Sequence, residues 1–353
     1  MSFNKSDYAG RGISGLANLG NTCFINSSIQ VLSHTYEFTE LINLSDEALK
    51  KKLNNQIDSV LLLEWLKLLR LMWSKNCIIA PRAFCKAIRI VATKKDAILF
   101  TGFLQNDAAE FLLFIIDCFH NALKREVEMV ISGKTVNKTD EVAVKCYSMI
   151  KNMYSKEYSE IVKLFYGTHV SMLKSMDTDE LISSNPEPYF MIDLPIPPTV
   201  NKAKEVSLLD CFDEYIKPEI LDGDNKVYNE KTKKKESMAK NIMFWSMPNI
   251  LIIDLKRFTV PGEKNNTLVK FEPNNVLDLQ KYVIGYNADK YKYELYGVIN
   301  HIGGVRGGHY TSAIKNADGK WYHYNDTNVS IIRDANKIVS PMAYCLFYRI
   351  VNG

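Results

Sequence analysis

The 353-residue sequence lacks the cysteine pairs that stabilise small secreted domains and zinc ribbons. It has seven cysteines, an odd number, and no two of them form a C-x-x-C pair. A disulfide framework normally uses an even number, and a zinc ribbon uses closely spaced pairs. The cysteine pattern therefore predicts a protein of a reducing compartment without disulfides.

Long apolar runs and a strong net charge are also missing. Residues 1–12 are polar and show no apolar core of a secretion signal. The most apolar stretch, Val60–Trp73, is interrupted by Glu64, Lys67 and Arg70, which is typical of a buried helix. The net charge of +4 is too small to indicate nucleic acid binding. We therefore expect an intracellular protein, cytoplasmic and/or nuclear, that binds neither membrane nor nucleic acid.

The order of the predicted elements indicates an α+β fold. Helical spacing of apolar residues comes first, over Cys23–Leu32, Ser59–Trp73 and Pro81–Ala92. Another helix should start after Asp107, with Glu110 completing a capping box. Segments rich in β-branched and aromatic residues follow and predict strands: Ile250–Leu255, Tyr291–Ile299, His309–Ile314, Trp321–Tyr324 and Tyr344–Ile350. Helices followed by strands favour an active site between the two parts.

Cys23 is a candidate nucleophile. It follows the segment Gly20-Asn21-Thr22 and precedes a predicted helix. A thiol at a helix N-terminus faces unpaired N–H groups and the positive end of the dipole, which favours the nucleophilic thiolate. The alternative is that Cys23 is a small buried apolar residue.

His309 is a candidate general base. Four glycines, Gly303, Gly304, Gly307 and Gly308, precede it and predict a loop that leaves room for a chain end. His301 lies close in the sequence and is the alternative base, and a structural role for either histidine is possible.

A predicted hairpin gives the imidazole a polar neighbour. If the loop after His309–Ile314 contains Ala317-Asp318-Gly319, Gly319 takes the left-handed position, and Asn325 shares a face with His309. A loop with an even number of residues would present Asp326 instead. The residues thus predict a Cys-His-Asn or Cys-His-Asp arrangement.

Five segments resemble the ubiquitin-specific protease family, a group of papain-like cysteine peptidases. The stretch Gly15–Gln30 resembles its cysteine box, and Leu104–Leu112 resembles its Q-x-D-A-x-E-F-L helix start. Three further matches are Leu255–Phe258, the pair Tyr293–His301 with Gly308–Tyr310, and Trp321–Asp326. The matches run in the family's order from Gly15 to Arg349, which is almost the whole chain.

The resemblance implies a papain-like fold with a thumb, fingers and a palm. Residues 1–14 would be an N-terminal extension, and residues 15–350 a single catalytic domain. The thumb would cover about residues 15–160. Residues 161–250 would form mainly the fingers, with some segments of the palm, and residues 251–350 would form the palm.

The resemblance also implies the roles of individual residues. Cys23 would be the nucleophile, His309 the base and Asn325 its orienter, with Asp326 assisting and Asn18 donating to the oxyanion. Gln105, Asp107, Gly308 and Tyr310 would line the cleft for the C-terminal tail of ubiquitin. The expected activity is hydrolysis of the isopeptide or peptide bond after that tail, by a monomer whose partners are ubiquitin and ubiquitinated proteins. A catalytically dead ubiquitin-binding module and a papain-type general protease are the alternatives.

One departure from the family concerns zinc. The family usually carries two C-x-x-C pairs in its fingers. The corresponding positions here are Ser175, Thr178, Asn229 and Thr232, which are poor zinc ligands, and His169 alone makes no site. We therefore expect no metal and no other cofactor. An apolar face should hold the fingers together: Phe190, Ile192, Leu194, Met243, Trp245 and Ile250.

Overall fold

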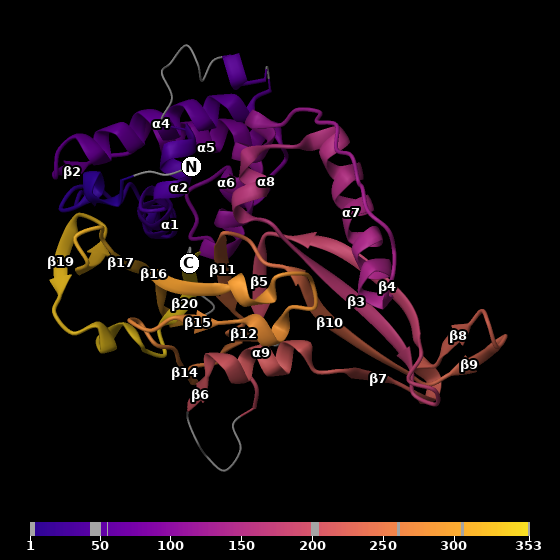
Figure 1. The fold of residues 1–353 in the computed structure, drawn as a ribbon. Helices are drawn as coiled ribbons and strands as arrows, with labels where there is room; N and C mark the ends of the chain where they lie inside the picture. Colours follow the sequence, from indigo (N-terminus) through magenta and orange to yellow (C-terminus); the bar gives the residue numbers. More distant parts are fainter. Residues whose placement is uncertain are drawn as a thin grey trace.

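The structure is a computed structural model that describes residues 4–42, 51–54, 56–198, 205–259, 262–304 and 307–351. Val305 and Arg306 lie outside these residues. The four glycines predicted to form a loop belong to paired strands, Gly303 and Gly304 to one and Gly307 and Gly308 to the next, so that prediction is wrong for them. A helical lobe covers one end of a central sheet, and a narrower sheet, which we call the arm, projects away from both (Figure 1). This arrangement is the predicted α+β fold.

The helical lobe comes from the first half of the chain. The predicted helices are present and differ from the predicted bounds by one or two residues. Pro81 precedes the first turn of its helix instead of occupying it. No described helix is long and apolar enough to cross a membrane. The helices are α1 (Cys23–Ser33), α2 (Tyr36–Ile42), α4 (Asp58–Ser74), α5 (Arg82–Lys94), α6 (Ala108–Leu123), α7 (Lys138–Glu157) and α8 (Glu160–Phe165).

The central sheet comes mainly from the last hundred residues. Its strand order is β19-β18-β17-β16-β20-β11-β5, and β15 pairs with β16. Among its described strands, β5 and β11 pair in parallel and the other neighbours are antiparallel. The strands are β5 (Met191–Leu194), β11 (Ile250–Leu255), β15 (Leu277–Asp278), β16 (Lys292–Gly304), β17 (Gly307–Lys315), β18 (Trp321–Asn325), β19 (Asn328–Ile332) and β20 (Ala343–Ile350).

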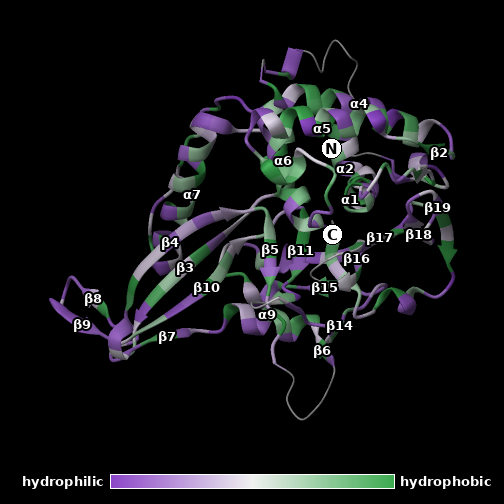
Figure 2. Cartoon of the chain, turned by 180° about the vertical axis from the view of Figure 1, so that it is seen from behind, coloured by the Kyte–Doolittle hydropathy of each residue, from purple (hydrophilic) through white to green (hydrophobic). Residues whose placement is uncertain are grey.

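The arm is a four-stranded sheet in the order β4-β3-β10-β7, with a separate hairpin β8–β9 at its tip. The strands are β3 (Gly167–Ser175), β4 (Leu181–Tyr189), β7 (Glu219–Leu221), β8 (Val227–Asn229), β9 (Lys234–Glu236) and β10 (Met238–Ser246). The tip is coloured as mainly hydrophilic in Figure 2. A small core of Val142, Ala143, Cys146, Val170 and Trp245 joins the base of the arm to α7.

The predicted apolar face of the fingers is wrong as a single unit. Phe190 and Ile250 pack in the core between the helical lobe and the sheet, whereas Ile192 and Leu194 belong to the second core of the sheet. Met243 is only partly buried. The alternation of side chains along each strand sends neighbouring apolar residues to different cores, which the sequence pattern did not reveal.

Shorter elements connect these parts. Helix α9 (Leu208–Ile216) packs beneath the sheet as part of the second core, through Leu208, Cys211 and Phe212. The remaining described strands are β1 (Gly15–Leu16), β2 (Ile78–Ile79), β6 (Glu205–Ser207), β12 (Phe258–Thr259), β13 (Glu263–Lys264) and β14 (Leu268–Lys270).

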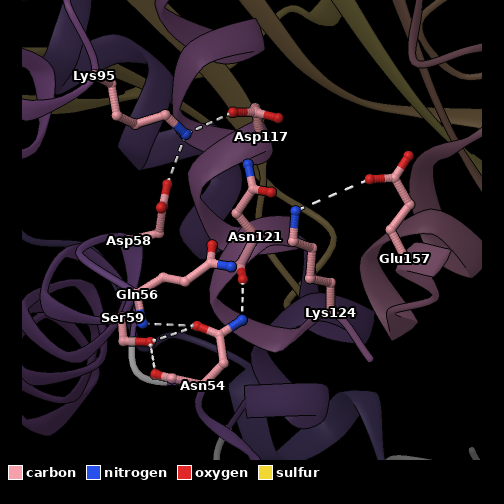
Figure 3. Close-up of polar contacts among 9 residues, drawn as sticks. All are labelled: Asn54, Gln56, Asp58, Ser59, Lys95, Asp117, Asn121, Lys124 and Glu157. Atoms are coloured by element: carbon pink, nitrogen blue, oxygen red, sulfur yellow. Dashed lines mark hydrogen bonds and ion pairs between the residues drawn. The ribbon is translucent and has the colours of Figure 1, made fainter. Parts of the chain in front are cut away.

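A polar cluster connects the start of α4, the end of α5 and α6 in the helical lobe (Figure 3). The Lys95 ammonium lies 2.7 Å from the Asp58 carboxylate at the start of α4 and 2.9 Å from the Asp117 carboxylate of α6. Asn54 donates to the carbonyl of Asn121, and Lys124 lies 3.9 Å from Glu157. Because Asp58 is almost fully buried, its ion pair with Lys95 holds α4 against α5 and α6.

Candidate active site

Cys23 is the first residue of α1, at the surface where the helical lobe meets the sheet. The turn before it is tightly wound, since Gly20 and Asn21 both have positive φ angles, of 95° and 56°. Asn18 stabilises this turn, because its Oδ1 accepts from the backbone N–H groups of Gly20 and Thr22 at 3.1 and 3.2 Å. The local sequence therefore places the thiol at the N-terminal end of α1, where its side chain is 3% exposed.

Burial outweighs the helix start in the electrostatics of Cys23. Its pKa is raised above the ordinary thiol value, mainly by burial and also by the nearby Asp326 carboxylate. The backbone N–H groups of Tyr310, Phe24 and Cys23 act in the opposite direction. The N–H groups at the helix start do favour the thiolate, as predicted, but burial outweighs them, so formation of the thiolate requires a base.

His309 lies on β17 beside the end of β18. Its Nε2 and the Oδ1 of Asn325 are 2.7 Å apart, so the ring donates to the amide oxygen. This bond leaves Nδ1 available for a thiol. Tyr310, whose backbone N–H donates to Cys23, follows His309 directly in the chain, so the imidazole and the thiol belong to one neighbourhood.

The register of the hairpin explains this pairing. Asn316 and Lys320 close the loop through a 2.9 Å bond, and Gly319 has a φ of 80°. The pairing Ser312↔Tyr324 continues the predicted three-residue loop register. That parity puts His309 and Asn325 on one face of the sheet, as predicted for the odd-numbered loop.

Asp326 occupies a different position from the predicted alternative. Its φ is 50°, and its carboxylate turns toward the helical lobe. Oδ2 accepts from the Asn18 amide at 3.0 Å, and Oδ1 accepts from the Asn26 amide at 2.8 Å. Asp326 therefore orients two amides near Cys23. Asn26 was missed by the sequence analysis, although its position within the cysteine box was a usable signal.

Gln105 and Gly308 bond to each other across a cavity of about 260 Å³. The Gln105 side chain donates to the Gly308 carbonyl and accepts from the Gly308 N–H, both at 3.0 Å. A side chain at Gly308 would lie 2.3 Å from the His301 ring, so only glycine fits there. The two predicted tail-binding residues therefore form a clasp over the cavity.

Asp107 and Tyr310 line the same cavity. The Asp107 Oδ1 accepts from the N–H groups of Ala109 and Glu110 at 2.7 and 3.1 Å, which confirms its capping role. Its Oδ2 accepts from the hydroxyls of Tyr310 and Tyr344, at 3.1 and 2.7 Å. Tyr344 was not predicted as a site residue. A tyrosine in a predicted strand gives no indication in the sequence that its hydroxyl contacts the N-cap residue of α6.

His301 is not the competitor of His309 for the catalytic position. It pairs with Tyr310 in the sheet, so its side chain lies on the opposite face from His309. Burial, followed by the nearby Lys264 charge, lowers the pKa of His301 to about 4. His301 is therefore a neutral, buried ring in the wall of the cavity.

The four positions expected to replace a zinc site bond to protein groups at the tip of the arm. Ser175 accepts from the N–H of Asp177 at 3.3 Å. The Glu236 carboxylate accepts from the Asn229 amide at 2.8 Å and from the Thr232 hydroxyl. His169 lies 3.4 Å from the Glu187 carboxylate. Among the described residues, the group with metal-ligand geometry is Asp58, Asp117 and Cys118, where the Lys95 ammonium already lies between the carboxylates.

Comparison with known proteins identifies the relatives of this chain. The family model described as ubiquitin carboxyl-terminal hydrolase matches residues 14–348. The chain is 32% identical over 351 residues to Ubiquitin carboxyl-terminal hydrolase Usp2 of Drosophila melanogaster, covering 98% of this chain and 36% of that protein. It is also 32% identical to Ubiquitin carboxyl-terminal hydrolase 2 of Bos taurus, covering 97% of this chain and 56% of the relative. The chain thus spans about a third to just over half of the length of these relatives.

A chain of the SAGA DUB module containing Ubp8, solved bound to monoubiquitin, is similar in structure. The TM-score is 0.73 at 22% identity, and the match covers 99% of this chain and 71% of that chain. The same module solved with ubiquitin aldehyde gives a TM-score of 0.73 at 23% identity. These values establish a shared mixed α+β fold. With the family model matched from residue 14 to residue 348, the chain belongs to the ubiquitin carboxyl-terminal hydrolase family.

Proposed function

We propose that this chain is a thiol-dependent deubiquitinase that hydrolyses the isopeptide or peptide bond after the C-terminal glycine of ubiquitin. Cys23 is the nucleophile, His309 the general base and acid, and Asn325 the orienter. The observation that carries the proposal is the 2.7 Å bond between His309 Nε2 and Asn325 Oδ1, beside a cysteine at the start of α1.

The reaction follows from the two ring nitrogens of His309. Asn325 holds Nε2–H, so Nδ1 takes the thiol proton of Cys23. The thiolate attacks the carbonyl of the terminal glycine, and the imidazolium then gives its proton to the leaving amine. Water activated by the same ring hydrolyses the thioester. The raised pKa of Cys23 makes this proton transfer part of each turnover.

The oxyanion is stabilised by Asn18 together with backbone N–H groups at the start of α1. One N–H of the Asn18 amide donates to Asp326, which fixes the plane of the amide and directs its other N–H outward. Asp326 therefore assists by holding the donor in place and does not act on the imidazole.

Specificity for a Gly-Gly tail is attributed to the cavity beneath the clasp. Gln105 and Gly308 bond to each other in its lining, and the side chains of Tyr310 and His301 line it as well. A chain end with side chains at its last two residues would collide with these groups. Ubiquitin and ubiquitinated proteins are the proposed partners, and a papain-type general protease is disfavoured by the same narrowness.

The subdomains follow the family pattern in this proposal. The helical lobe, residues 15–160, is the thumb; the arm, within 161–250, is the fingers; and residues 251–350 form most of the palm. The fingers hold no zinc, since Glu236 binds the two side chains that stand where ligands would be expected. Residues 1–14 are an N-terminal extension, and the enzyme acts as a monomer without a cofactor.

A ubiquitin probe with a C-terminal electrophile tests the proposal. The unsubstituted chain should form a covalent adduct at Cys23 and hydrolyse ubiquitin–aminomethylcoumarin. Cys23→Ala should lose turnover by at least about 10⁴-fold while binding ubiquitin with unchanged affinity. Hydrolysis by Cys23→Ala within tenfold of the unsubstituted chain would contradict the assignment, and binding of ubiquitin without any adduct would favour the catalytically dead module. A panel of ubiquitin-like modifiers serves as the control for specificity.

A further inference from the structure

A second cavity lies on the palm, on the other side of the sheet from the clasp. Its volume is about 550 Å³, larger than the cavity beneath the clasp. Residues of β16, β17, β18 and β19 line it, together with residues of the following segment, 333–342. We call it the palm cavity. Neither the proposed catalytic residues nor the proposed tail-binding residues line it.

The register places the palm cavity directly beside the catalytic pair. Ile302, which lines it, is the cross-strand partner of His309. Thr311, which also lines it, directly precedes Ser312, the partner of Tyr324, so continuing the register by one residue brings Thr311 opposite Asn325. These four side chains share one face, whereas the side chains of Tyr310 and His301, which line the cavity beneath the clasp, point to the other face. The cavity therefore continues the face that carries the general acid.

The chemistry of the palm cavity is apolar inside and basic at the rim. Ile302, Ile331 and Met342 are 46%, 48% and 41% exposed, which is high for large apolar side chains. Arg333 and Lys337 lie at the rim, and neither forms an ion pair within the described residues. The rim acid, Asp334, accepts from the N–H of Asn336 as a cap.

One polar group in the floor also lacks a partner. Asn300 is 9% exposed and lines the cavity, and its Oδ1 has no hydrogen bond to any described group. Leaving a buried acceptor unpaired is costly, so an occupant that donates an N–H there is favoured. Polypeptide backbone supplies such a donor, whereas a purely apolar molecule does not.

We propose that the palm cavity receives the segment of the target protein that carries the modified lysine, with an apolar residue beside the lysine in the cavity and acidic residues on Arg333 and Lys337. This inference rests on the proposed deubiquitinase function. His309 protonates the leaving amine, so the lysine must approach on the face of His309. The polypeptide attached to that lysine continues over the same face, and Ile302 is the first cavity residue it meets.

Substrates that differ only on the amine side test this assignment. Ubiquitin is joined by an isopeptide bond to a peptide whose lysine is flanked by leucine and glutamates, or to a matched peptide with serine and lysines in their place. Ubiquitin–aminomethylcoumarin carries no peptide and reports the catalytic machinery alone. The variants are Arg333→Glu/Lys337→Glu and, as a matched control on α5 outside the cavity, Lys86→Glu/Lys94→Glu.

The double reversal in the cavity should lower kcat/KM for the acidic conjugate by about tenfold and raise it for the basic conjugate. Its coumarin hydrolysis should stay unchanged, and the α5 control should behave like the unsubstituted chain. The inverted preference separates docking from a folding defect, which would lower all three rates. Equal preference for both conjugates by the unsubstituted chain would overturn the assignment. Failure of the unsubstituted chain on coumarin would instead count against the proposed function.

A second measurement does not depend on catalysis. The unconjugated acidic peptide is titrated into Cys23→Ala labelled at isoleucine methyl groups. Shifts are expected at Ile302 and Ile331, with none at the exposed Ile78 on β2. The absence of shifts at millimolar peptide, or shifts confined to other isoleucines, would overturn the proposal even if the enzyme proves inactive.

Discussion

At the residue scale, Cys23 shows how two effects at one site can oppose each other. Its position at the start of α1 exposes it to backbone N–H groups that favour the thiolate, but its side chain is almost fully buried. The free energy lost when the thiolate is removed from water exceeds the stabilisation that the backbone N–H groups give it, so the pKa of Cys23 rises. The imidazole of His309 then has to supply what the helix start does not, which explains why both residues are needed in the proposed mechanism.

The division of labour between Asn325 and Asp326 gives a prediction. Asn325→Ala should lower kcat by about 10²-fold or more, because Nε2 of His309 loses the acceptor that fixes the ring. Asp326→Ala should lower kcat less, by about tenfold, because it loosens Asn18 and leaves His309 held. Steady-state hydrolysis of ubiquitin–aminomethylcoumarin measures both.

Two controls support the interpretation of that prediction. Asn325→Asp keeps an acceptor for the ring and should retain most of the activity. Asn18→Ala and Asp326→Ala should be non-additive when combined, since they act through one amide. If Asp326→Ala proves the more damaging single variant, the imidazole is oriented by the other residue, and the proposed roles must be exchanged.

At the element scale, the clasp between Gln105 and Gly308 connects the loop before α6 with the start of β17. Gln105→Ala should remove both of its bonds to Gly308. The backbone amide hydrogen of Gly308 should then exchange with solvent faster. KM for ubiquitin–aminomethylcoumarin should rise by about threefold or more, because the Gln105 side chain no longer holds Gly308 in place at the cavity. Hydrogen exchange with mass spectrometry and steady-state kinetics measure the two effects.

Matched variants decide whether the clasp matters in itself. Gln105→Glu keeps an acceptor for the Gly308 N–H but loses the donor to its carbonyl, so it should behave between glutamine and alanine. Thr101→Val removes only a local bond to the Ile98 carbonyl, outside the lining of the cavity, and should leave KM unchanged. An unaltered KM in Gln105→Ala would show that the cover does not contribute to ubiquitin binding.

The tip of the arm gives a second prediction at this scale. Elemental analysis should find no stoichiometric zinc, and activity should survive a strong chelator, because hydroxyls and amides are weak zinc ligands. Glu236→Ala should instead speed exchange of the hairpin amides of residues 227–236, since Asn229 and Thr232 lose their acceptor. Unfolding of the unsubstituted chain on chelation would refute the zinc-free interpretation.

At the scale of the whole molecule, a buried polar junction joins the helical lobe to the sheet. His34, at the end of α1, accepts or donates at both ring nitrogens: Nε2 lies 3.2 Å from the Tyr324 hydroxyl, and Nδ1 lies 2.9 Å from the Gln30 carbonyl. Arg349 of β20 donates to the His34 carbonyl at 2.9 Å and lies over the rings of Tyr36 and Tyr296. The relative position of the two lobes, and hence of Cys23 and His309, depends on this junction.

The junction predicts how stability changes with pH. Burial, and then the Arg349 charge, lowers the pKa of His34 from 6.5 to about 4 in the folded chain. Between pH 6.5 and about 4 the unfolded chain therefore binds a proton that the folded chain does not. The contribution of His34 to the free energy of unfolding is complete above pH 6.5 and decreases as the pH falls from 6.5 to about 4. Between pH 7.5 and 5 the expected loss from His34 is about 2 kcal/mol. Urea unfolding at the two pH values measures it.

The control for this prediction replaces His34 by a side chain that does not titrate. His34→Gln keeps a polar amide in the junction and should be less stable than the unsubstituted chain at pH 7.5. Its loss of stability on going to pH 5 should be smaller. An equal loss in both chains would assign the acid sensitivity to other groups, such as His301.

The sequence by itself determined the family, the bounds of α1, α4 and α5 to within two residues, and the reactive candidates. It did not determine the strands of the arm or the end of β16, which runs to Gly304. Cys23 and His309 stand in segments whose glycines and caps are local features, and the three-residue loop ending in Gly319 fixes the parity that brings Asn325 to the face of His309. These properties depend on neighbours within a few residues, which a sequence displays directly.

The tertiary structure decided the properties that depend on distant segments. It raised the pKa of Cys23 by burial, turned Asp326 toward Asn18 and Asn26, and brought Tyr344 to Asp107 across 237 positions of chain. It also divided the predicted apolar face of the arm among three cores and created the palm cavity between β19 and the segment that follows it. Burial and long-range contacts are set by packing of the whole chain, and no local pattern encodes them.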